Sequence, residues 1–385
     1  MIRRRLESVI RERMFRGKAI LVLGPRQTGK TTLLKEITKD QPGGVLWLDG
    51  DEPFARNLLT DANIAGLKSM TGNHKILVVD EAQQVKNIGS TLKLITDHIP
   101  EVQLLVSGSS SLDLAEEVNE PLTGRKFEFF LYPLSFEELK DHHGVLDEQR
   151  LLEQRLIYGS YPEVITTGMN KGEILGLIAG SYLYKDIFKF KDLRRPELLD
   201  RLLQALALQL GSEISYYELA QTIGANTETI QRYIELLEKT FVIFRLRSFS
   251  RNLRNELKKS HKVYFYDNGI RNALISNFST LALRTDLGAL WENYLVSERK
   301  KYLQYSNTMT NSYFWRTRQQ QEIDYIEEKD GILNAYEFKW NVNSKAKLPL
   351  TFSKAYTEHR YELITSGNYA SFLSYNSNAP GFQQD

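Results

Sequence analysis

The chain has 385 residues, 42% hydrophobic and 25% charged, a balance typical of globular proteins, and its length predicts two or three domains. There are no cysteines, which excludes disulfides, thiolate metal sites and cysteine nucleophiles and fits a cytoplasmic location. The formal net charge of +2 indicates no particular partner, so a nucleic-acid surface would need local clustering of basic residues. No apolar run approaches a membrane span and the charged start lacks the core of a secretory signal, so we expect no membrane contact.

Residues 1–155 alternate apolar strand patterns with helical segments, the order of a parallel α/β sheet. We expect strands at residues 19–23, 45–48, 76–79, 104–107 and 127–131. The middle three end in polar residues, at Asp49, at Asp80-Glu81 and at Ser107–Ser110. Ligands of open α/β sheets bind beyond the carboxyl ends of strands, so these polar ends are expected to converge on one ligand.

The first predicted strand leads directly into a sequence with the spacing G-x-x-x-x-G-K-[ST], and a helix beginning near Thr32 follows it. The residues of this predicted P-loop are Gly24, Pro25, Arg26, Gln27, Thr28, Gly29, Lys30 and Thr31. The glycines let backbone N–H groups face phosphate oxygens, Lys30 reaches the outer phosphates, and the hydroxyl of Thr31 is a ligand for Mg²⁺. The predicted ligands are therefore ATP and Mg²⁺.

A second motif supports this interpretation, since the third predicted strand ends in Asp80-Glu81. In P-loop enzymes the aspartate holds Mg²⁺ through water, and the next carboxylate polarises the attacking water. The alternative, a chance glycine loop in an ordinary strand–helix turn, leaves the second motif unexplained. The two motifs together predict ATP hydrolysis, with Lys30 and Glu81 as catalytic residues and Thr31 and Asp80 at the metal.

Residues 156–195 are predicted as a helical connector, and residues 196–270 as a winged-helix domain. Two helices flank a turn at Gly224, the second with its own threonine cap, and a hairpin of residues 241–246 and 262–266 follows. Seven basic residues lie on the predicted wing, with Glu256 as the single acid: Arg245, Arg247, Arg251, Arg254, Lys258, Lys259 and Lys262. Phosphate attraction makes Arg251, Arg254, Lys258 and Lys259 the predicted DNA contacts. Glu228 and Glu235 in the second helix oppose this, and a rigid spacer or protein dock is the alternative.

Residues 271–375 are predicted to form a further α/β domain and residues 376–385 a disordered tail. The domain has a helix at 290–296, strands at 313–316, 322–327 and 334–340, a further helix, and a strand at 362–365. Glu337 and Lys339 share a strand face, and a hairpin can bring Asp324 beside them. Two carboxylates and a lysine can bind Mg²⁺ and stabilise an attacking hydroxide, so Asp324 and Glu337 are predicted metal ligands, and Glu337 and Lys339 catalytic residues. A solvated strand face with a hairpin salt bridge is the alternative.

Four segments carry a resemblance to a known group: Gly24–Thr32, Leu77–Gln83, Leu105–Ser111 and Leu122–Arg125, with later matches at Gly159–Pro162 and Tyr184–Ile187. The chain resembles the AAA-type ATPases of bacteria and archaea that carry a C-terminal winged-helix and nuclease-like region of uncharacterised function. The resemblance implies a polar sensor at Ser109 or Ser110. It also implies an arginine, Arg125, that touches nucleotide, in a neighbouring subunit if the chain is a homo-oligomer. A surface salt bridge is the alternative for Arg125.

The C-terminal pattern resembles the D-x(n)-E-x-K core of the restriction-endonuclease-like fold, with Glu292 at the auxiliary helix position. The favoured interpretation is a Mg²⁺-dependent ATPase that acts as a switch and repositions the winged-helix and nuclease-like regions. The alternative is an ATP-gated DNA-binding or protein-scaffolding module with an inert nuclease fold. A small-molecule kinase is less favoured, because no acceptor pocket or lid is recognisable.

Overall fold

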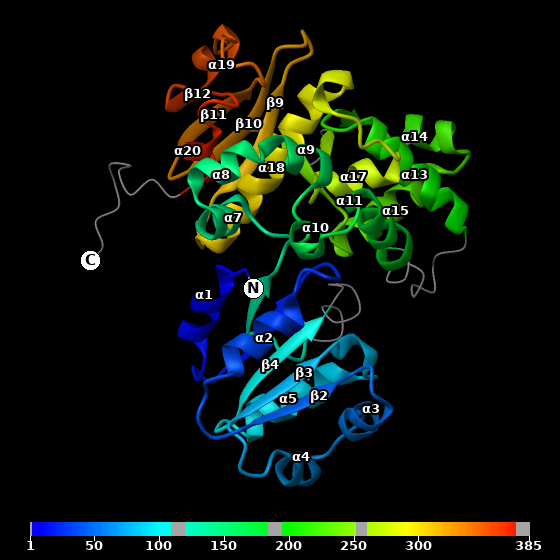
Figure 1. Ribbon diagram of the computed structural model, residues 1–385, viewed down its shortest axis with the longest axis vertical. Coiled ribbons are helices and arrows are strands. Elements are labelled where there is room, and N and C mark those ends of the chain that lie inside the picture. The colour runs from blue at the N-terminus through cyan, green and yellow to red at the C-terminus, as the bar shows by residue number, and fades with distance from the viewer. Residues whose placement is uncertain (1, 109–119, 184–194, 252–259, 375–385) are drawn as a thin grey trace.

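The computed structural model describes residues 2–108, 120–183, 195–251 and 260–374. The described residues form an N-terminal part, blue to cyan in Figure 1, and a larger part that follows it. Each part is built around a sheet of its own. Among these residues no helix is both long and apolar enough to cross a membrane. The predicted tail, residues 376–385, and the segment Tyr184–Ile187 lie outside the described residues.

The N-terminal sheet has five parallel strands, as predicted from the alternation of strand and helix patterns. In chain order they are β1 (Ala19–Leu23), β2 (Val45–Asp49), β3 (Ile76–Asp80), β4 (Gln103–Gly108) and β5 (Lys126–Phe130). Their order across the sheet is β2-β3-β4-β1-β5. The three central strands are buried along their whole length, whereas β2 and β5 at the edges are mostly half-buried. Helices on both faces explain the continuous apolar runs of the central strands.

The helices of this part are α1 (Leu6–Arg13), α2 (Lys30–Thr38), α3 (Pro53–Leu59), α4 (Ile64–Thr71) and α5 (Ile88–His98), with a short 3₁₀ turn, η1 (Ala82–Gln84). Helix α2 begins at Lys30, within the last two residues of the predicted P-loop, and packs on α1 and against β3 and β4. The N-terminus of α2 therefore stands at the carboxyl ends of β1 and β3, where an anion would be stabilised.

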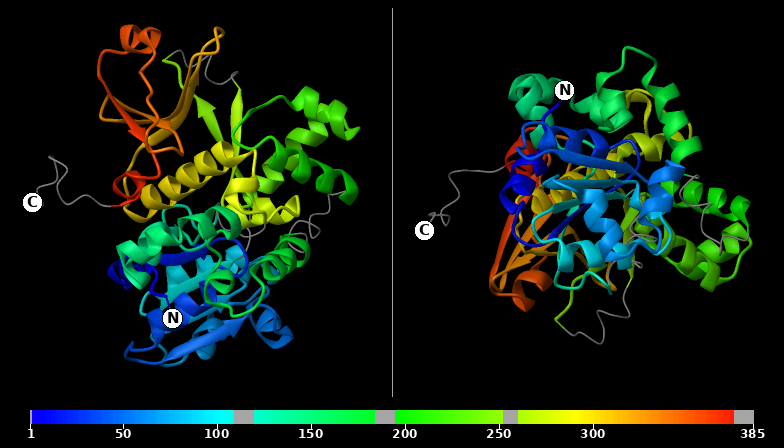
Figure 2. Two further views of the ribbon diagram at one scale, coloured as in Figure 1. Left: turned by 45° about the horizontal axis from the view of Figure 1, so that its top comes forward. Right: turned by 90° about the horizontal axis from the view of Figure 1, so that it is seen from below.

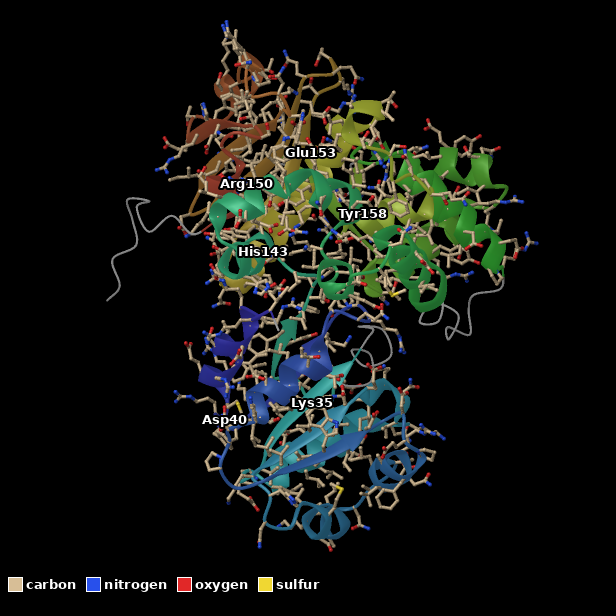
Figure 3. All side chains as sticks on the ribbon, viewed as in Figure 1. Lys35, Asp40, His143, Arg150, Glu153 and Tyr158 are labelled. Carbon is tan, nitrogen blue, oxygen red and sulfur yellow. The ribbon has the colours of Figure 1, made fainter. Side chains whose placement is uncertain are left out.

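A run of short helices connects the two parts: α7 (Phe136–His143), α8 (Val145–Arg150), α9 (Leu152–Tyr158), α10 (Pro162–Thr166), α11 (Lys171–Leu177) and η2 (Ile178–Leu183). The side chain of Ser135 and that of Glu138 cap the start of α7 reciprocally. The predicted boundary at residue 155 falls within α9, and α7 already packs on the C-terminal part, since the ring centroids of Phe136 and Tyr369 are 5.4 Å apart. In Figure 3 the labelled side chains of α7, α8 and α9 lie above α2, which carries Lys35.

The middle part contains α13 (Pro196–Leu208), β6 (Glu213–Ile214), α14 (Tyr216–Ile223), α15 (Thr227–Lys239), β7 (Ile243–Ser248) and β8 (His261–Phe265). Strand β8 pairs antiparallel with β7 and with β6, so the expected hairpin is present. The predicted threonine cap of α15 is wrong, because the cap is Asn226, whose side chain accepts from the Thr229 N–H at 2.7 Å. Asparagine is at least as good a cap as threonine, and here it precedes the first helical residue.

The C-terminal elements are α17 (Asn268–Leu274), η3 (Leu281–Leu283), α18 (Leu287–Tyr305), β9 (Asn311–Arg316), β10 (Glu322–Lys329), β11 (Ile332–Phe338), α19 (Leu350–Ala355), β12 (His359–Ile364) and α20 (Tyr369–Leu373). Strands β9, β10 and β11 are antiparallel, and β12 is parallel to β11. The long helix α18 lies between these strands and the connector helices (Figure 2).

The middle and C-terminal parts share one sheet, which the sequence did not predict. Strand β7 pairs parallel with β9 through Arg247 opposite Tyr313 and Ser248 opposite Phe314. The combined sheet has the order β12-β11-β10-β9-β7-β8-β6. The predicted boundary at residue 270 falls inside α17. It divides two regions that are joined by the backbone hydrogen bonds between β7 and β9.

Candidate functional site

The predicted P-loop forms a tight turn between β1 and α2. Gly24 has a φ of +152°, and a Cβ there would lie 2.1 Å from the carbonyl oxygen of Leu131. Gly29 has a φ of +91° immediately before α2, and Gln27 has a φ of +60°. A side chain at Gly24 would collide with the backbone, so this position requires glycine.

Lys30, at the first position of α2, folds back over the loop that precedes it. Its Nζ donates to the carbonyl oxygens of Gly24 and Pro25, both at 2.9 Å. The Thr28 hydroxyl also donates to Pro25 O at 2.9 Å, which closes the turn. The lysine is buried, whereas Thr31 is half-buried and Thr32 exposed. Its ammonium is therefore held at the concave side of a glycine-rich loop, where phosphate oxygens would replace the carbonyl partners.

Asp80 and Glu81 stand at the carboxyl end of β3. Asp80 is buried and accepts a hydrogen bond from the hydroxyl of Ser107 at the end of the neighbouring strand β4. The Glu81 N–H lies 3.2 Å from both Asp80 Oδ1 and Ser107 Oγ. Glu81 itself has a φ of +49°, a rare backbone conformation for a residue other than glycine. Such conformations cluster at functional sites.

The Glu81 carboxylate is tied to the P-loop. Arg26 Nη2 lies 3.9 Å from Glu81 Oε2, and Gln83 Nε2 donates to the same oxygen at 2.6 Å. The structure thus brings the two predicted motifs together at one edge of the sheet, with Arg26 between them.

Arg4, a residue that the sequence did not single out, anchors the P-loop from the N-terminal segment. Its guanidinium donates to Thr28 O at 2.5 Å, to Tyr132 O at 2.6 Å and to Glu138 Oε1 at 3.0 Å. A cavity of about 380 Å³ beside the loop is lined by residues 2–4, by Glu7 and Glu36, by Thr28, Gly29, Thr32 and Leu33, and by Leu134 and Pro162. It adjoins the start of α2 and has mixed apolar and polar walls, as expected for a site that accepts part of a nucleotide.

The resemblance implies a polar sensor and an arginine, and the structure describes only the arginine. Ser109 and Ser110 lie outside the described residues. Arg125 precedes β5 and accepts at its carbonyl from the Ala19 N–H, at the start of β1, whereas the P-loop follows the end of β1. Its side chain pairs with Asp97 at 2.6 Å and is 42% exposed. Any nucleotide that Arg125 touches would therefore belong to a neighbouring subunit.

The C-terminal part brings together the second predicted set of residues. Asp324 on β10 faces Glu337 on β11, since Tyr325 pairs with Tyr336 in the antiparallel register. Asp324 Oδ2 accepts from the Phe338 N–H at 2.8 Å, and Lys339 Nζ lies 2.7 Å from Glu337 Oε1. Burial, together with the charges of Glu292 and Glu337, raises the pKa of Asp324 to about 8. The three carboxylates of α18, β10 and β11 thus lie within electrostatic range of one another.

A cation from the middle part occupies this cluster. Lys262 on β8 is only 2% exposed, and its Nζ lies 2.9 Å from Glu292 Oε1 and 2.5 Å from Glu322 Oε1. The Tyr264 hydroxyl donates to Glu292 at 2.6 Å. Burial alone would lower the pKa of Lys262, but the charges of the neighbouring carboxylates raise it above its ordinary value. The charged form of its ammonium is therefore stabilised by the surrounding acids.

The donor set fits a divalent cation only in part. Asp324 and Glu337 lie opposite each other on β10 and β11. Their carboxylates offer the hard oxygen ligands that Mg²⁺ prefers. However, the described residues contain no group of three or more His, Asp or Glu side chains placed to hold a metal ion together. Glu292 and Glu322, the nearby carboxylates of this cluster, form ion pairs with Lys262.

Two of the seven basic residues on the predicted wing form ion pairs with acidic side chains and so add no free positive charge to the surface. Lys262 is buried in the carboxylate cluster, and Arg245 pairs with Glu238 at 2.5 Å. Arg251 is exposed and lies 5.6 Å from the ring centroid of Tyr356. Arg254, Lys258 and Lys259 lie outside the described residues.

Comparison with known families finds a match in the N-terminal part. Residues 16–140 match the family described as an AAA domain. This match and the P-loop geometry support an AAA-type ATPase, as the sequence predicted. Residues 149–281 and 287–378 match two families described as domains of unknown function, DUF8612 and DUF4143.

Over most of its length the chain is similar to proteins described as uncharacterized. One from Mycobacterium tuberculosis is 27% identical over 343 residues, covering 88% of this chain and 74% of the relative. Another from Methanocaldococcus jannaschii is 25% identical over 365 residues, covering 88% of this chain and 79% of the relative.

Among solved structures, the RuvB Holliday junction branch migration motor of Thermotoga maritima is 15% identical and covers 67% of this chain and 95% of its own, with a TM-score of 0.31. A signal transduction ATPase of Pyrococcus horikoshii with a tetratricopeptide repeat sensor is 14% identical, covers 79% of this chain and 47% of its own, and has a TM-score of 0.29. Scores this low assign neither fold nor activity to this chain.

Proposed function

We propose that this protein is a Mg²⁺-dependent ATPase whose hydrolysis cycle acts as a switch on its C-terminal half. The observation that carries the proposal is the meeting of the glycine loop, Lys30, Asp80 and Glu81 at one edge of a parallel sheet. The AAA-domain match over residues 16–140 supports the same class.

Phosphate binding falls to the loop amides and Lys30. The Lys30 ammonium, now bonded to two loop carbonyls, would exchange them for β- and γ-phosphate oxygens. The N-terminus of α2 adds the favourable field of its helix dipole. The cavity beside Thr28 and Thr32 would take another part of the nucleotide.

Metal binding falls to Thr31 and Asp80, whose hydroxyl and carboxylate are donors that suit Mg²⁺. When bound, the metal supplies neutralisation of charge on the transferred phosphoryl group. The Ser107 hydroxyl orients the Asp80 carboxylate by its hydrogen bond. Glu81 would accept the proton of the attacking water, once its carboxylate leaves Arg26 and Gln83.

The test is phosphate release from ATP by four proteins. Lys30→Ala should bind ATP at least about 10-fold more weakly and release no phosphate, because a charge-assisted contact is lost. Glu81→Gln should bind ATP normally yet release phosphate at least about 100-fold more slowly. Lys39→Ala, at the other end of the same helix, is the control and should match wild type. Normal turnover by Lys30→Ala would refute the ATPase proposal.

For the C-terminal half we propose a winged-helix unit joined to a nuclease-like unit. The order α13-β6-α14-α15-β7-β8 with an antiparallel wing supports the first, and the order α18-β9-β10-β11-α19-β12 supports the second. Which activity this half has depends on the carboxylate cluster.

The alternative of an inert nuclease fold is favoured by one observation, the Lys262 ammonium held between Glu292 and Glu322. A buried lysine neutralises the charge that would otherwise attract a divalent cation. In this alternative the ATPase would regulate DNA binding or protein scaffolding rather than strand cleavage. DNA contact would use the exposed Arg251 together with Arg254, Lys258 and Lys259.

Cleavage assays decide between the two forms of the proposal. Wild type is incubated with duplex DNA, single-stranded DNA and RNA in Mg²⁺ or Mn²⁺, beside Glu337→Ala. Cleavage by wild type that disappears in Glu337→Ala would establish an active site at Asp324, Glu337 and Lys339. Absence of cleavage, with Mn²⁺ binding gained in Lys262→Met, would establish the inert form.

We also propose that Arg125 acts on the nucleotide of a neighbouring subunit in a homo-oligomer. Its position at the far end of β1 from the P-loop motivates the proposal. Mixing Arg125→Ala with Glu81→Gln should then restore part of the activity, because a mixed interface joins an intact Glu81 of one subunit to an intact Arg125 of the other. The rate should also depend on protein concentration. A monomer with full activity at all concentrations would refute it.

A further inference from the structure

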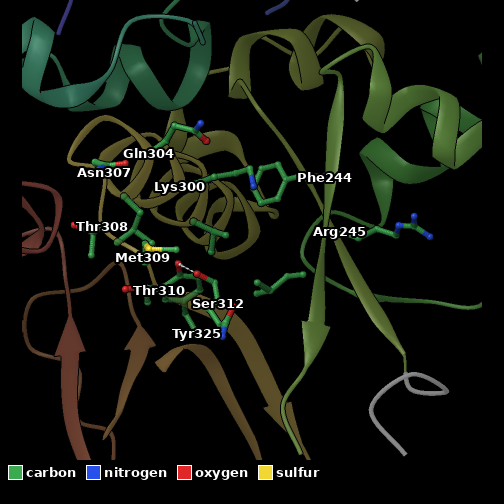
Figure 4. A pocket seen from close by; sticks show the side chains of 14 residues that line it. Phe244, Arg245, Lys300, Gln304, Asn307, Thr308, Met309, Thr310, Ser312 and Tyr325 are labelled. Atoms are coloured by element: carbon green, nitrogen blue, oxygen red, sulfur yellow. Dashed lines mark hydrogen bonds between the residues drawn. The ribbon is translucent and has the colours of Figure 1, made fainter. Parts of the chain in front are cut away.

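A cavity of about 420 Å³ lies at the junction of the middle and C-terminal parts. Strand β7 forms one wall, and the second half of α18 with the segment leading into β9 forms the other (Figure 4). Its volume falls within the range of pockets that hold small organic molecules. No residue of the P-loop motifs or of the carboxylate cluster lines it, so it is a separate site.

The walls of this cavity combine an apolar base with a polar rim. Phe244, Leu246, Val296 and Leu303 contribute buried side chains. The hydroxyls of Ser312 and Tyr325, 2.7 Å apart, and the side chains at positions 307, 308, 310 and 311 supply the polar groups. A few polar groups above an apolar base are typical of sites that orient a small ligand.

The charges of the lining are all positive. Arg245 and Lys300 line the cavity, and no aspartate or glutamate does. The Arg245 guanidinium is already engaged, at 2.9 and 2.5 Å from Glu238 Oε2 and at 2.8 Å from the Tyr216 hydroxyl. Lys300 is therefore the cation that remains to receive a ligand.

Lys300 sits among aromatic rings rather than carboxylates. Its Nζ is 5.0 Å from the ring centroid of Phe244 and 6.0 Å from that of Tyr266, and Figure 4 shows the side chain extending from α18 toward Phe244. Within the described part of the chain no carboxylate forms an ion pair with it. Burial lowers the pKa of Lys300, with Glu238 opposing this shift only partly. A half-buried ammonium whose nearest partners are rings is incompletely compensated.

We propose that this cavity binds a small organic anion, with phosphate or carboxylate oxygens on the Lys300 ammonium and a hydroxyl-rich body against the polar rim. A lysine is a point charge, so it accepts either kind of anionic group, whereas the planar fork of Arg245 is occupied. Because β7 and α18 form opposite walls, the ligand would bridge the middle and C-terminal parts.

The experiment is calorimetric titration of the full chain with ribose 5-phosphate and with citrate, which separate the phosphate and carboxylate sources. Each is repeated in the Lys30→Ala background, so that binding at the P-loop is not counted. We expect at least one probe to bind with a dissociation constant below roughly 1 mM. Lys300→Met should weaken that binding about 10- to 100-fold, the usual value of a charge-assisted contact. Lys354→Met, an exposed lysine on α19, should not change it.

A second variant keeps the test independent of folding. Asn307 is exposed on the rim with a φ of +51°, a conformation that aspartate tolerates, so Asn307→Asp adds a negative charge there without altering the core. It should weaken anion binding several-fold and leave thermal unfolding unchanged. Failure of both probes to bind at roughly 5 mM, or equal binding by wild type and Lys300→Met, would overturn the proposal.

Discussion

Replacing Arg4 by methionine tests whether the N-terminal segment holds the P-loop in place. The Arg4–Glu138 pair, 3.0 Å apart, is buried on both sides, and the same guanidinium satisfies the carbonyls of Thr28 and Tyr132. Methionine conserves the stem but leaves the Glu138 carboxylate buried without a cation. Breaking a buried pair in this way costs about 3–5 kcal/mol. Because one lost contact is to the P-loop itself, ATP binding should weaken as well.

The measurement must isolate the unfolding of the N-terminal part, because a chain of several parts does not unfold in one step. Of the four tryptophans only Trp47, in β2, belongs to this part, so its fluorine resonance in fluorotryptophan-labelled protein reports unfolding in urea. Arg5→Met is the matched control. Its nearer partner Asp141 lies 2.9 Å away with both side chains substantially exposed, and its second partner Glu137 lies 3.7 Å away, so the cost should be at most about 1 kcal/mol.

A double-mutant cycle with Glu138→Gln completes the test. Each single change leaves one buried charge unpaired, whereas the double change removes both charges. The double variant should therefore be less destabilised than the sum of the single ones by about 1–3 kcal/mol. Additivity within about 0.5 kcal/mol, or equal costs for Arg4→Met and Arg5→Met, would refute the reasoning.

Four further changes follow from the same structure. Gly24→Ala should cost about 1–3 kcal/mol and weaken ATP binding, because its Cβ would meet Leu131 O at 2.1 Å; Gly17→Ala, where nothing lies within 4 Å, should bind ATP normally. Ser107→Ala should raise the Mg²⁺ concentration needed for half-maximal hydrolysis, measured by titration, and an unchanged requirement would contradict the role given to its bond with Asp80. Charge reversal at Arg251 and Arg254 should weaken DNA binding and flatten its salt dependence, and an unchanged slope in a binding titration would move the contact elsewhere. Burial would raise the pKa of Asp286, but hydrogen bonds from Arg284 and Arg271 lower it. The stability that these two contacts add is therefore present above the ordinary pKa of 3.8 and is lost as the pH falls through the lowered pKa. Asp286→Asn should reduce this acid-dependent loss of stability, measured by urea titration at several pH values, and a pH profile identical to that of wild type would contradict the reasoning.

The sequence by itself determined the N-terminal fold class and the nucleotide motifs. The spacing of Gly24, Gly29 and Lys30 is local, and each motif follows an apolar strand run, so the position of Lys30 and Asp80 at the carboxyl ends of β1 and β3 required no knowledge of distant contacts. The hairpin that sets Asp324 opposite Glu337 was predictable for the same reason, since strand alternation and a short turn define it.

Only the tertiary structure decided which distant groups meet at these sites. Ser107 reaches Asp80 because β4 lies beside β3, and Arg4 reaches Thr28 because α1 packs on α2. Lys262 showed no sequence signal beyond a basic stretch, and the pairing of β7 with β9, which joins the wing to the C-terminal sheet, accompanies its burial among Glu292 and Glu322. Pairing between distant strands depends on packing of the whole chain, and local spacing does not encode it.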